Sequence, residues 1–237
     1  MPSPSSWSSV SPVSQTGITN IDALLLGTRW GSSTITYSFP GYGATWATST
    51  TTGYGPTTGT REPWSPSFAP LSTPGAGDDQ VYFASALQKW ANVANLNFIL
   101  VADTASNVGD IRAAYSYQAD KSGYQAWAYY PWASSTAGDL WININGTSAA
   151  ETWTPGSFSY MTILHELGHA LGLKHDFEAG GTVSTVLSST LDTRSFTLMS
   201  YAAQAGVQRT YFSFEPTTPA ATQIPPVMAT SKSPSSG

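Results

Sequence analysis

The chain has 237 residues, a formal net charge of −5 and no cysteine. Hydrophobic residues make up 41% of it, as in a globular protein, but charged residues make up only 10%, against roughly 25% in an average domain. The acidic balance argues against nucleic acid and anionic membranes as partners, and no apolar run is long enough for a transmembrane helix. Without cysteine, disulfides and thiolate-bound zinc are excluded.

The N-terminal third alternates between low-complexity stretches and one strand pattern. Residues 1–16 are rich in Ser and Pro, which predicts disorder, and they lack the charge and apolar core of a standard signal peptide. Residues 34–39 alternate apolar and polar side chains and predict a half-buried strand. Residues 41–77 are dense in Gly, Thr, Ser and Pro, so we expect a long surface loop.

Residues 78–94 have helical spacing of apolar side chains, and Asp78 is placed to cap the helix. Strand patterns follow at residues 97–102, 110–117, 126–130 and 140–144. Helices interspersed with strands favour an α+β fold with one main sheet.

All three histidines of the chain, His165, His169 and His175, lie within eleven residues. In a helix over residues 159–171, His165 and His169 share a face one turn, or about 6 Å, apart, so both can reach one metal ion. Glu166 lies about 100° round the helix, beside the metal, where it can deprotonate a zinc-bound water. The spacing predicts a zinc site with three histidine ligands and a general base.

His175 can complete this site only if the helix ends before it. In a continued helix it would lie about 15 Å below His165 and about 80° off its face. Gly172 is placed to end the helix, because glycine accepts the left-handed conformation.

Residues 195–201, Ser-Phe-Thr-Leu-Met-Ser-Tyr, resemble the Met-turn of the metzincin peptidases, in the form typical of the serralysin branch. In that family the methionine lies beneath the ligands, and the tyrosine is a switchable fifth ligand that donates a hydrogen bond to the tetrahedral intermediate. By this resemblance those residues are Met199 and Tyr201. Taken alone, Met199 also fits ordinary core packing, and Tyr201 an ordinary half-buried aromatic residue.

The resemblance to serralysin catalytic domains covers about residues 17–216. It rests on residues 17–25, 35–39, 81–98, 109–112 and 138–143. It implies a metzincin-type (zincin) α+β domain with one twisted mixed sheet, a long helix before the strands and an active-site helix ending at Gly172. Residues 217–237 are then an irregular tail, without the calcium-binding repeats of the family.

His175 is followed by Asp176, where many serralysins have proline. We expect an exposed turn carboxylate at this position. A role of Asp176 beside the zinc is the alternative.

An extended substrate needs an exposed strand edge with which its main chain can pair. The candidate is the segment Ala126-Trp127-Ala128-Tyr129-Tyr130. Pro131 follows it, and proline, which has no N–H to donate to a neighbouring strand, is tolerated at the edge of a sheet. A plain core strand is the alternative.

The resemblance implies a secreted, monomeric zinc endopeptidase that acts on polypeptides, with one catalytic Zn²⁺, Glu166 as base and Tyr201 as oxyanion donor. It also allows bound Ca²⁺, although the repeat domain is absent, and a proteinaceous inhibitor as partner. One alternative is a zinc-stabilised peptide-binding module with weak or no catalysis, against which the intact Glu166 argues. The other is a shortened chain that folds poorly.

Overall fold

The computed structural model describes residues 1–64, 67–72, 75, 77–118, 121 and 123–202. The tail expected over residues 217–237 and the last part of the predicted catalytic domain, residues 203–216, lie outside this range. None of the described helices is long and apolar enough to cross a membrane.

The main sheet of the described residues has six strands. Five follow the order β5 (Asn97–Leu100), β3 (Thr34–Ser38), β6 (Ile111–Ser116), β8 (Asp139–Asn143) and β7 (Ala126–Ala128), and β4 (Phe68–Pro70) pairs with β6. The neighbours β5, β3, β6 and β8 are parallel, whereas β7 and β4 are antiparallel to their partners. The predicted α+β fold with a mixed sheet is confirmed.

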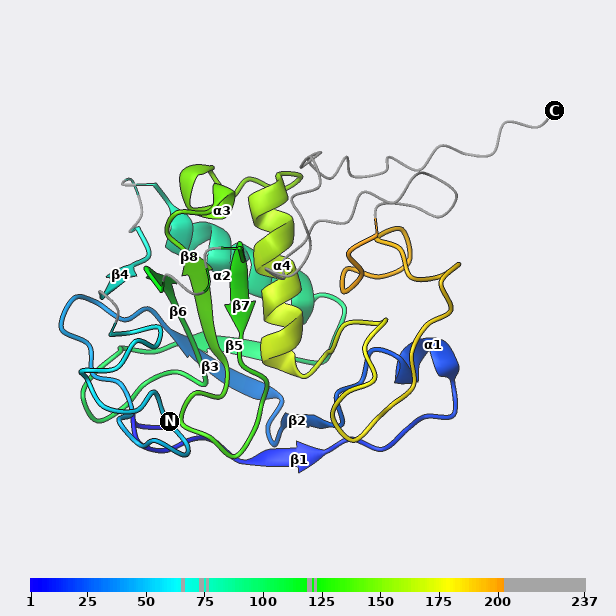
Figure 1. The fold of residues 1–237 in the computed structure, drawn as a ribbon, viewed down its shortest axis with the longest axis horizontal. Coiled ribbons are helices and arrows are strands. Elements are labelled where there is room, and N and C mark those ends of the chain that lie inside the picture. The colour runs from blue at the N-terminus through cyan, green and yellow to red at the C-terminus, as the bar shows by residue number, and fades with distance from the viewer. Residues whose placement is uncertain (65–66, 73–74, 76, 119–120, 122, 203–237) are drawn as a thin grey trace.

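Two long helices, α2 (Asp79–Ala91) and α4 (Phe158–Leu171), pack together and cover one face of this sheet (Figure 1). The helix α2 precedes β5 to β8 but follows β3, so only part of the sheet comes after it in the chain. The core between helices and sheet is apolar, and its largest fully buried side chains include Phe83, Leu87, Ile111, Leu140 and Ile163. Of the two short helices, α1 (Thr19–Asp22) and α3 (Thr147–Ala150), α3 contacts α4 and β8, and its Ala149 packs on this core.

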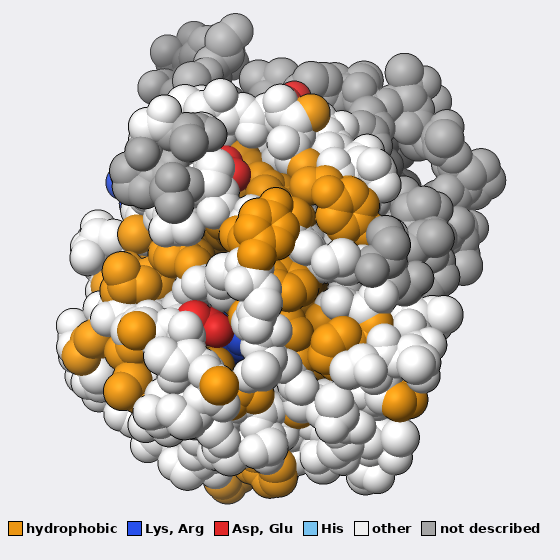
Figure 2. Space-filling view, turned by 90° about the vertical axis from the view of Figure 1, so that its left-hand side faces the viewer, with side chains coloured by type: hydrophobic (Ala, Val, Ile, Leu, Met, Phe, Trp, Pro, Cys, Tyr) orange, Lys and Arg blue, Asp and Glu red, His pale blue; other side chains and the backbone are white. Residues whose placement is uncertain are grey.

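The opposite face of the sheet carries a second, aromatic core. Trp46, Tyr54 and Phe68 pack there against Trp141 of β8 and Ala114 of β6. The surface loop predicted for residues 41–77 is therefore wrong in this part, since the glycine-rich stretch holds buried aromatic side chains and β4. Figure 2 looks at the side of β4 and this segment, where hydrophobic side chains reach the surface among polar ones.

The structure also differs from the sequence prediction near the N-terminus. Within residues 1–16, where composition predicts disorder, β1 (Val10–Pro12) pairs antiparallel with β2 (Thr28–Trp30). A strand this short has little apolar pattern, and its pairing with distant residues gives it order.

The predicted cap of α2 is wrong as well. Asp78 has φ +61° and makes no side-chain capping bond. Instead Ser72 Oγ accepts a hydrogen bond from Asp79 N (3.1 Å), and Asp79 Oδ2 accepts one from Ser72 N (3.1 Å). The acceptor for the first helical N–H thus comes from seven residues upstream.

Candidate metal centre and active site

The helix α4 presents two different faces. It begins after Ser157, whose hydroxyl accepts a hydrogen bond from Tyr160 N (3.1 Å), as expected of an N-cap. Ile163 and Leu167 are fully buried in the core on one side. This packing fixes the rotation of the helix and directs the other side toward β7 and the metal centre.

Gly172 ends this helix in the left-handed conformation, with φ +105°. Its N–H donates to His169 O (2.9 Å), and the next N–H, of Leu173, donates to Gly168 O (2.9 Å), which is the Schellman pattern. A Cβ at Gly172 would lie 2.3 Å from Thr28 O, so a side chain is excluded here. The chain reverses at this glycine, as the histidine spacing predicts.

The reversal brings the three histidines together. His175 Nε2 lies 3.2 Å from His165 Nε2 and 3.1 Å from His169 Nε2, and all three side chains are buried. Ligand nitrogens at about 2.05 Å from a tetrahedral zinc ion lie roughly 3.3 Å apart. Two of the three nitrogen–nitrogen distances thus match the spacing of zinc ligands, and all three nitrogens lie within 4.8 Å of one another.

Backbone carbonyls fix the tautomers of two of these histidines. His165 Nδ1 lies 2.8 Å from Leu198 O, and His169 Nδ1 lies 2.7 Å from Leu173 O. Because a carbonyl can only accept, Nδ1 carries the hydrogen and Nε2 keeps its lone pair for a metal. Burial, with His175 nearby, lowers the pKa of His165 to about 3, which also favours the neutral, ligating form. The residues present thus fit a zinc ion.

Met199 packs directly against the turn of α4 that carries the ligands. It is 1% exposed, and a Cβ at Gly168 would lie 2.7 Å from Met199 Sδ. The preceding carbonyl, of Leu198, is the one that holds His165. The segment predicted as a Met-turn thus packs against α4 at Gly168 and contacts His165 through the Leu198 carbonyl.

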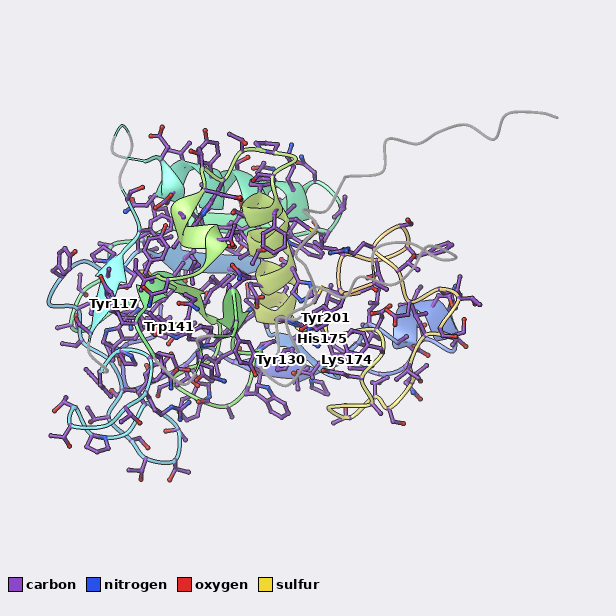
Figure 3. All side chains as sticks on the ribbon, turned by 45° about the horizontal axis from the view of Figure 1, so that its top comes forward. Tyr117, Tyr130, Trp141, Lys174, His175 and Tyr201 are labelled. Carbon is purple, nitrogen blue, oxygen red and sulfur yellow. The ribbon has the colours of Figure 1, made fainter. Side chains whose placement is uncertain are left out.

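Tyr201 lies beside the third histidine (Figure 3), with its hydroxyl 2.7 Å from His175 Nε2. Phe177 stacks on the His175 ring, with ring centroids 5.1 Å apart and planes 4° from parallel, and its ring also lies 5.0 Å from that of Tyr201. Glu178 Oε2 lies 2.9 Å from His175 Nδ1. Sequence reasoning missed Phe177 and Glu178, because nothing in their pattern marks them as neighbours of the ligand.

A cavity of about 160 Å³ opens in front of the histidines. Its lining combines groups from β7 and the segment around it, from α4 and from the chain after Gly172: Tyr124, Ala126, Trp127, Ala128, Tyr130, Glu166, His169, His175, Glu178 and Tyr201. Glu166 thus faces the same space as two of the candidate ligands. Four of the five residues predicted for the edge strand line this cavity, whereas Tyr129 does not.

The two residues on either side of His175, Lys174 and Asp176, are buried, although charged residues in loops are usually exposed. Lys174 is 1% exposed, and its ammonium donates to three backbone carbonyls, those of Ala23 (2.7 Å), Glu178 (2.6 Å) and Thr185 (2.7 Å). Asp176 is fully buried, so the exposed turn carboxylate expected here is wrong. Burial, together with the Asp192 carboxyl, raises the pKa of Asp176 to about 7.

An α+β domain with two histidines and a glutamate on one helix, and a third histidine after the glycine that ends it, has the architecture of a metallopeptidase. Residues 57–213, more than half of the chain, match the family model described as Metallo-peptidase family M12. The chain therefore belongs to Metallo-peptidase family M12.

The chain is also similar to serralysins. It is 34% identical to Metalloprotease AprA of Pseudomonas entomophila (strain L48) over 134 residues, which are 53% of this chain and 27% of that protein. It is 38% identical to Serralysin C of Dickeya chrysanthemi over 124 residues (49% and 25%), and 30% identical to Serralysin of Photorhabdus luminescens over 126 residues (50% and 25%). The matched region thus spans about a quarter of the length of these relatives.

Proposed function

We propose that the chain is a zinc-dependent endopeptidase that hydrolyses peptide bonds of extended polypeptides, with its catalytic domain over residues 17–216. One observation carries the proposal, namely that three histidine Nε2 atoms converge beside a cavity that Glu166 also lines. The membership in Metallo-peptidase family M12 supports it.

His165, His169 and His175 would hold the zinc ion, which when bound acts as a Lewis acid on the substrate carbonyl and on a water molecule. Glu166 follows the first ligand on the helix and faces the cavity. Its carboxylate takes the proton of the attacking water and passes it to the leaving amine. The base and two of the three ligands, His165 and His169, come from one helix, so their relative placement does not depend on a loop.

Tyr201 supplies a hydrogen-bond donor beside the reacting carbonyl. Its hydroxyl is directed at the ligand nitrogens, 2.7 Å from His175 Nε2, and it lines the cavity. In this position it donates to the oxyanion that develops on the substrate.

The strand β7 binds the substrate main chain. Among the described strands it pairs only with β8, so its other side is the edge of the sheet. An extended peptide can add to such an edge by main-chain hydrogen bonds. Ala126 and Ala128 line the cavity with small side chains, so we expect broad tolerance of substrate sequence.

Three further proposals concern the setting of this activity. The chain acts outside the cell, and it acts as a monomer that a proteinaceous inhibitor can block. Calcium has no part in the proposed reaction.

The experiment that tests the proposal uses the zinc-loaded chain, casein and an internally quenched octapeptide. We expect hydrolysis that a chelator abolishes and that added zinc restores. Glu166→Gln should lower kcat/KM by at least about 10³-fold, since it removes the base, while the protein still binds one zinc. The exposed glutamate Glu151, changed to Gln, is the matched control and should keep full activity. If the wild type binds one zinc and cleaves neither substrate, the chain is the non-catalytic binding module instead.

A further inference from the structure

The edge strand β7 directs its side chains to two different cores. Ala126 and Ala128 face α4 and the main core, whereas Trp127 and Tyr129 pack on the aromatic core at the back of the sheet. The strand has only three residues and pairs with β8 alone among the described strands. Few main-chain hydrogen bonds hold it, so its side chains must fix its position.

Glu62 binds the two back-facing side chains of this strand. Its Oε1 accepts a hydrogen bond from Trp127 Nε1 (3.1 Å) and a second, short one from the Tyr129 hydroxyl. Burial and the Glu62 carboxylate raise the pKa of Tyr129, so this hydroxyl stays protonated and donates. One carboxylate oxygen therefore links two alternate residues of the edge strand.

The carboxylate is itself held from several directions. Its side chain is 2% exposed, and a buried carboxylate is stable only where donors surround it. Arg61 Nη2 donates to the Tyr129 hydroxyl (2.6 Å), and Arg61 Nε lies 3.4 Å from Glu62 Oε2. Ser116 Oγ, at the end of β6, donates to the Glu62 backbone carbonyl (3.2 Å). Glu62 is thus fixed to the centre of the sheet while it holds the edge.

Trp127 connects this arrangement to the active site, because the same residue that donates to Glu62 also lines the cavity beside the histidines. A shift of its indole would move the cavity wall. A shift of the strand would move the main-chain groups with which a peptide pairs.

We propose that Glu62 is a positioning residue for substrate: it fixes the edge strand β7 and the Trp127 side of the cavity so that an extended peptide can bind. This inference rests on the proposed endopeptidase function. It assigns a role to the segment of residues 41–64, which lies behind the sheet and does not touch the metal centre.

The test compares variants of the full, zinc-loaded chain with the quenched octapeptide. Glu62→Ala removes the acceptor, Tyr129→Phe removes one donor, and Glu62→Gln keeps an oxygen that both donors can reach. The matched control is Tyr115→Phe, since the Tyr115 hydroxyl also donates to a buried carboxylate, Asp79 (2.7 Å), but on β6 and away from β7.

We expect Glu62→Ala and Tyr129→Phe to raise KM about tenfold with little change in kcat, since a lost hydrogen bond to a charged group is of this order. Glu62→Gln should recover most of the loss, and Tyr115→Phe should leave KM unchanged. Inhibition by a peptidyl hydroxamate should weaken in parallel with KM, whereas acetohydroxamate, which reaches only the metal, should bind all variants equally. Backbone hydrogen exchange over residues 126–129 should be faster in Glu62→Ala than in the wild type. In Glu62→Gln and Tyr115→Phe it should stay at the wild-type rate.

Two results would overturn the inference. If the wild type cleaves the octapeptide but Glu62→Ala and Tyr129→Phe match Tyr115→Phe in KM, Glu62 serves stability only, and the endopeptidase function stands. If the zinc-loaded wild type does not cleave the octapeptide, the proposed function fails, and the role of Glu62 in substrate binding fails with it. Because Tyr129→Phe is a milder change, the comparison holds even if Glu62→Ala does not fold.

Discussion

Replacing Gly172 by Ala tests whether the end of α4 controls the metal centre. Two costs follow from the structure. An L-residue in the left-handed region costs roughly 1–2 kcal/mol, and the Cβ would meet the Thr28 carbonyl at 2.3 Å, a backbone contact that no rotamer can relieve, worth about 1–3 kcal/mol. We expect a loss of about 2–5 kcal/mol in the free energy of unfolding.

The same substitution should weaken zinc binding. Relief of the clash moves Leu173, whose carbonyl holds His169, and with it His175. We expect zinc affinity, measured by competition with a chromogenic chelator, to fall at least about tenfold. A tenfold loss of affinity corresponds to about 1.4 kcal/mol, which is less than the strain that the substitution introduces. Gly156→Ala is the matched control, because Gly156 has a similar φ of +97° but open space around it. If both variants lose equal stability and neither loses zinc affinity, the reasoning about Gly172 is wrong.

Three further results are expected. Tyr201→Phe should lower kcat about 10²-fold or more with zinc content unchanged; equal loss of zinc and activity would make Tyr201 structural. Lys174→Met leaves one buried and two part-buried hydrogen bonds to carbonyls unmade and should lower the free energy of unfolding by about 3 kcal/mol in urea; a loss under about 1 kcal/mol contradicts this. Burial raises the pKa of Asp139 from 3.8 to about 7, so the folded chain keeps a proton that the unfolded chain releases. This contribution, about 4 kcal/mol at most, is complete below pH 3.8 and lost as the pH rises to about 7. Asp139→Asn should remove it from urea unfolding measured across that range, and an unchanged pH dependence would count against it.

The parts of the site that follow from local sequence were predictable. Helical spacing places His165 beside His169, and the position of His175 requires a turn at Gly172. The structure has that turn, with the helix ending at Leu171. Residues 126–130 are a candidate edge strand, with a core strand as the alternative, because Pro131 would interrupt the ladder; among the described strands β7 pairs only with β8.

The parts that depend on long-range contacts were not predictable. Glu62 stands in a stretch whose composition reads as loop, and its partners lie about 65 residues further along the chain. Asp176 reads as a turn carboxylate, yet it is fully buried, with Leu187 N bonded to its carbonyl and the Asp192 carboxyl beside it. In each case a polar side chain is buried by residues that are distant in the sequence. The local pattern of polar and apolar residues carries no signal of such partners.

The ammonium of Lys174 occupies the meeting point of three backbone carbonyls, one from the end of α1 and two from the segment after α4, a place where other proteins use a bound ion. Because this cation is covalently part of the chain, a chelator cannot extract it. Stripping the zinc should therefore leave the loop that carries His175 in place, and the emptied protein should take up zinc again without refolding. The fold separates the cation that maintains the shape of the site from the one that would perform its chemistry.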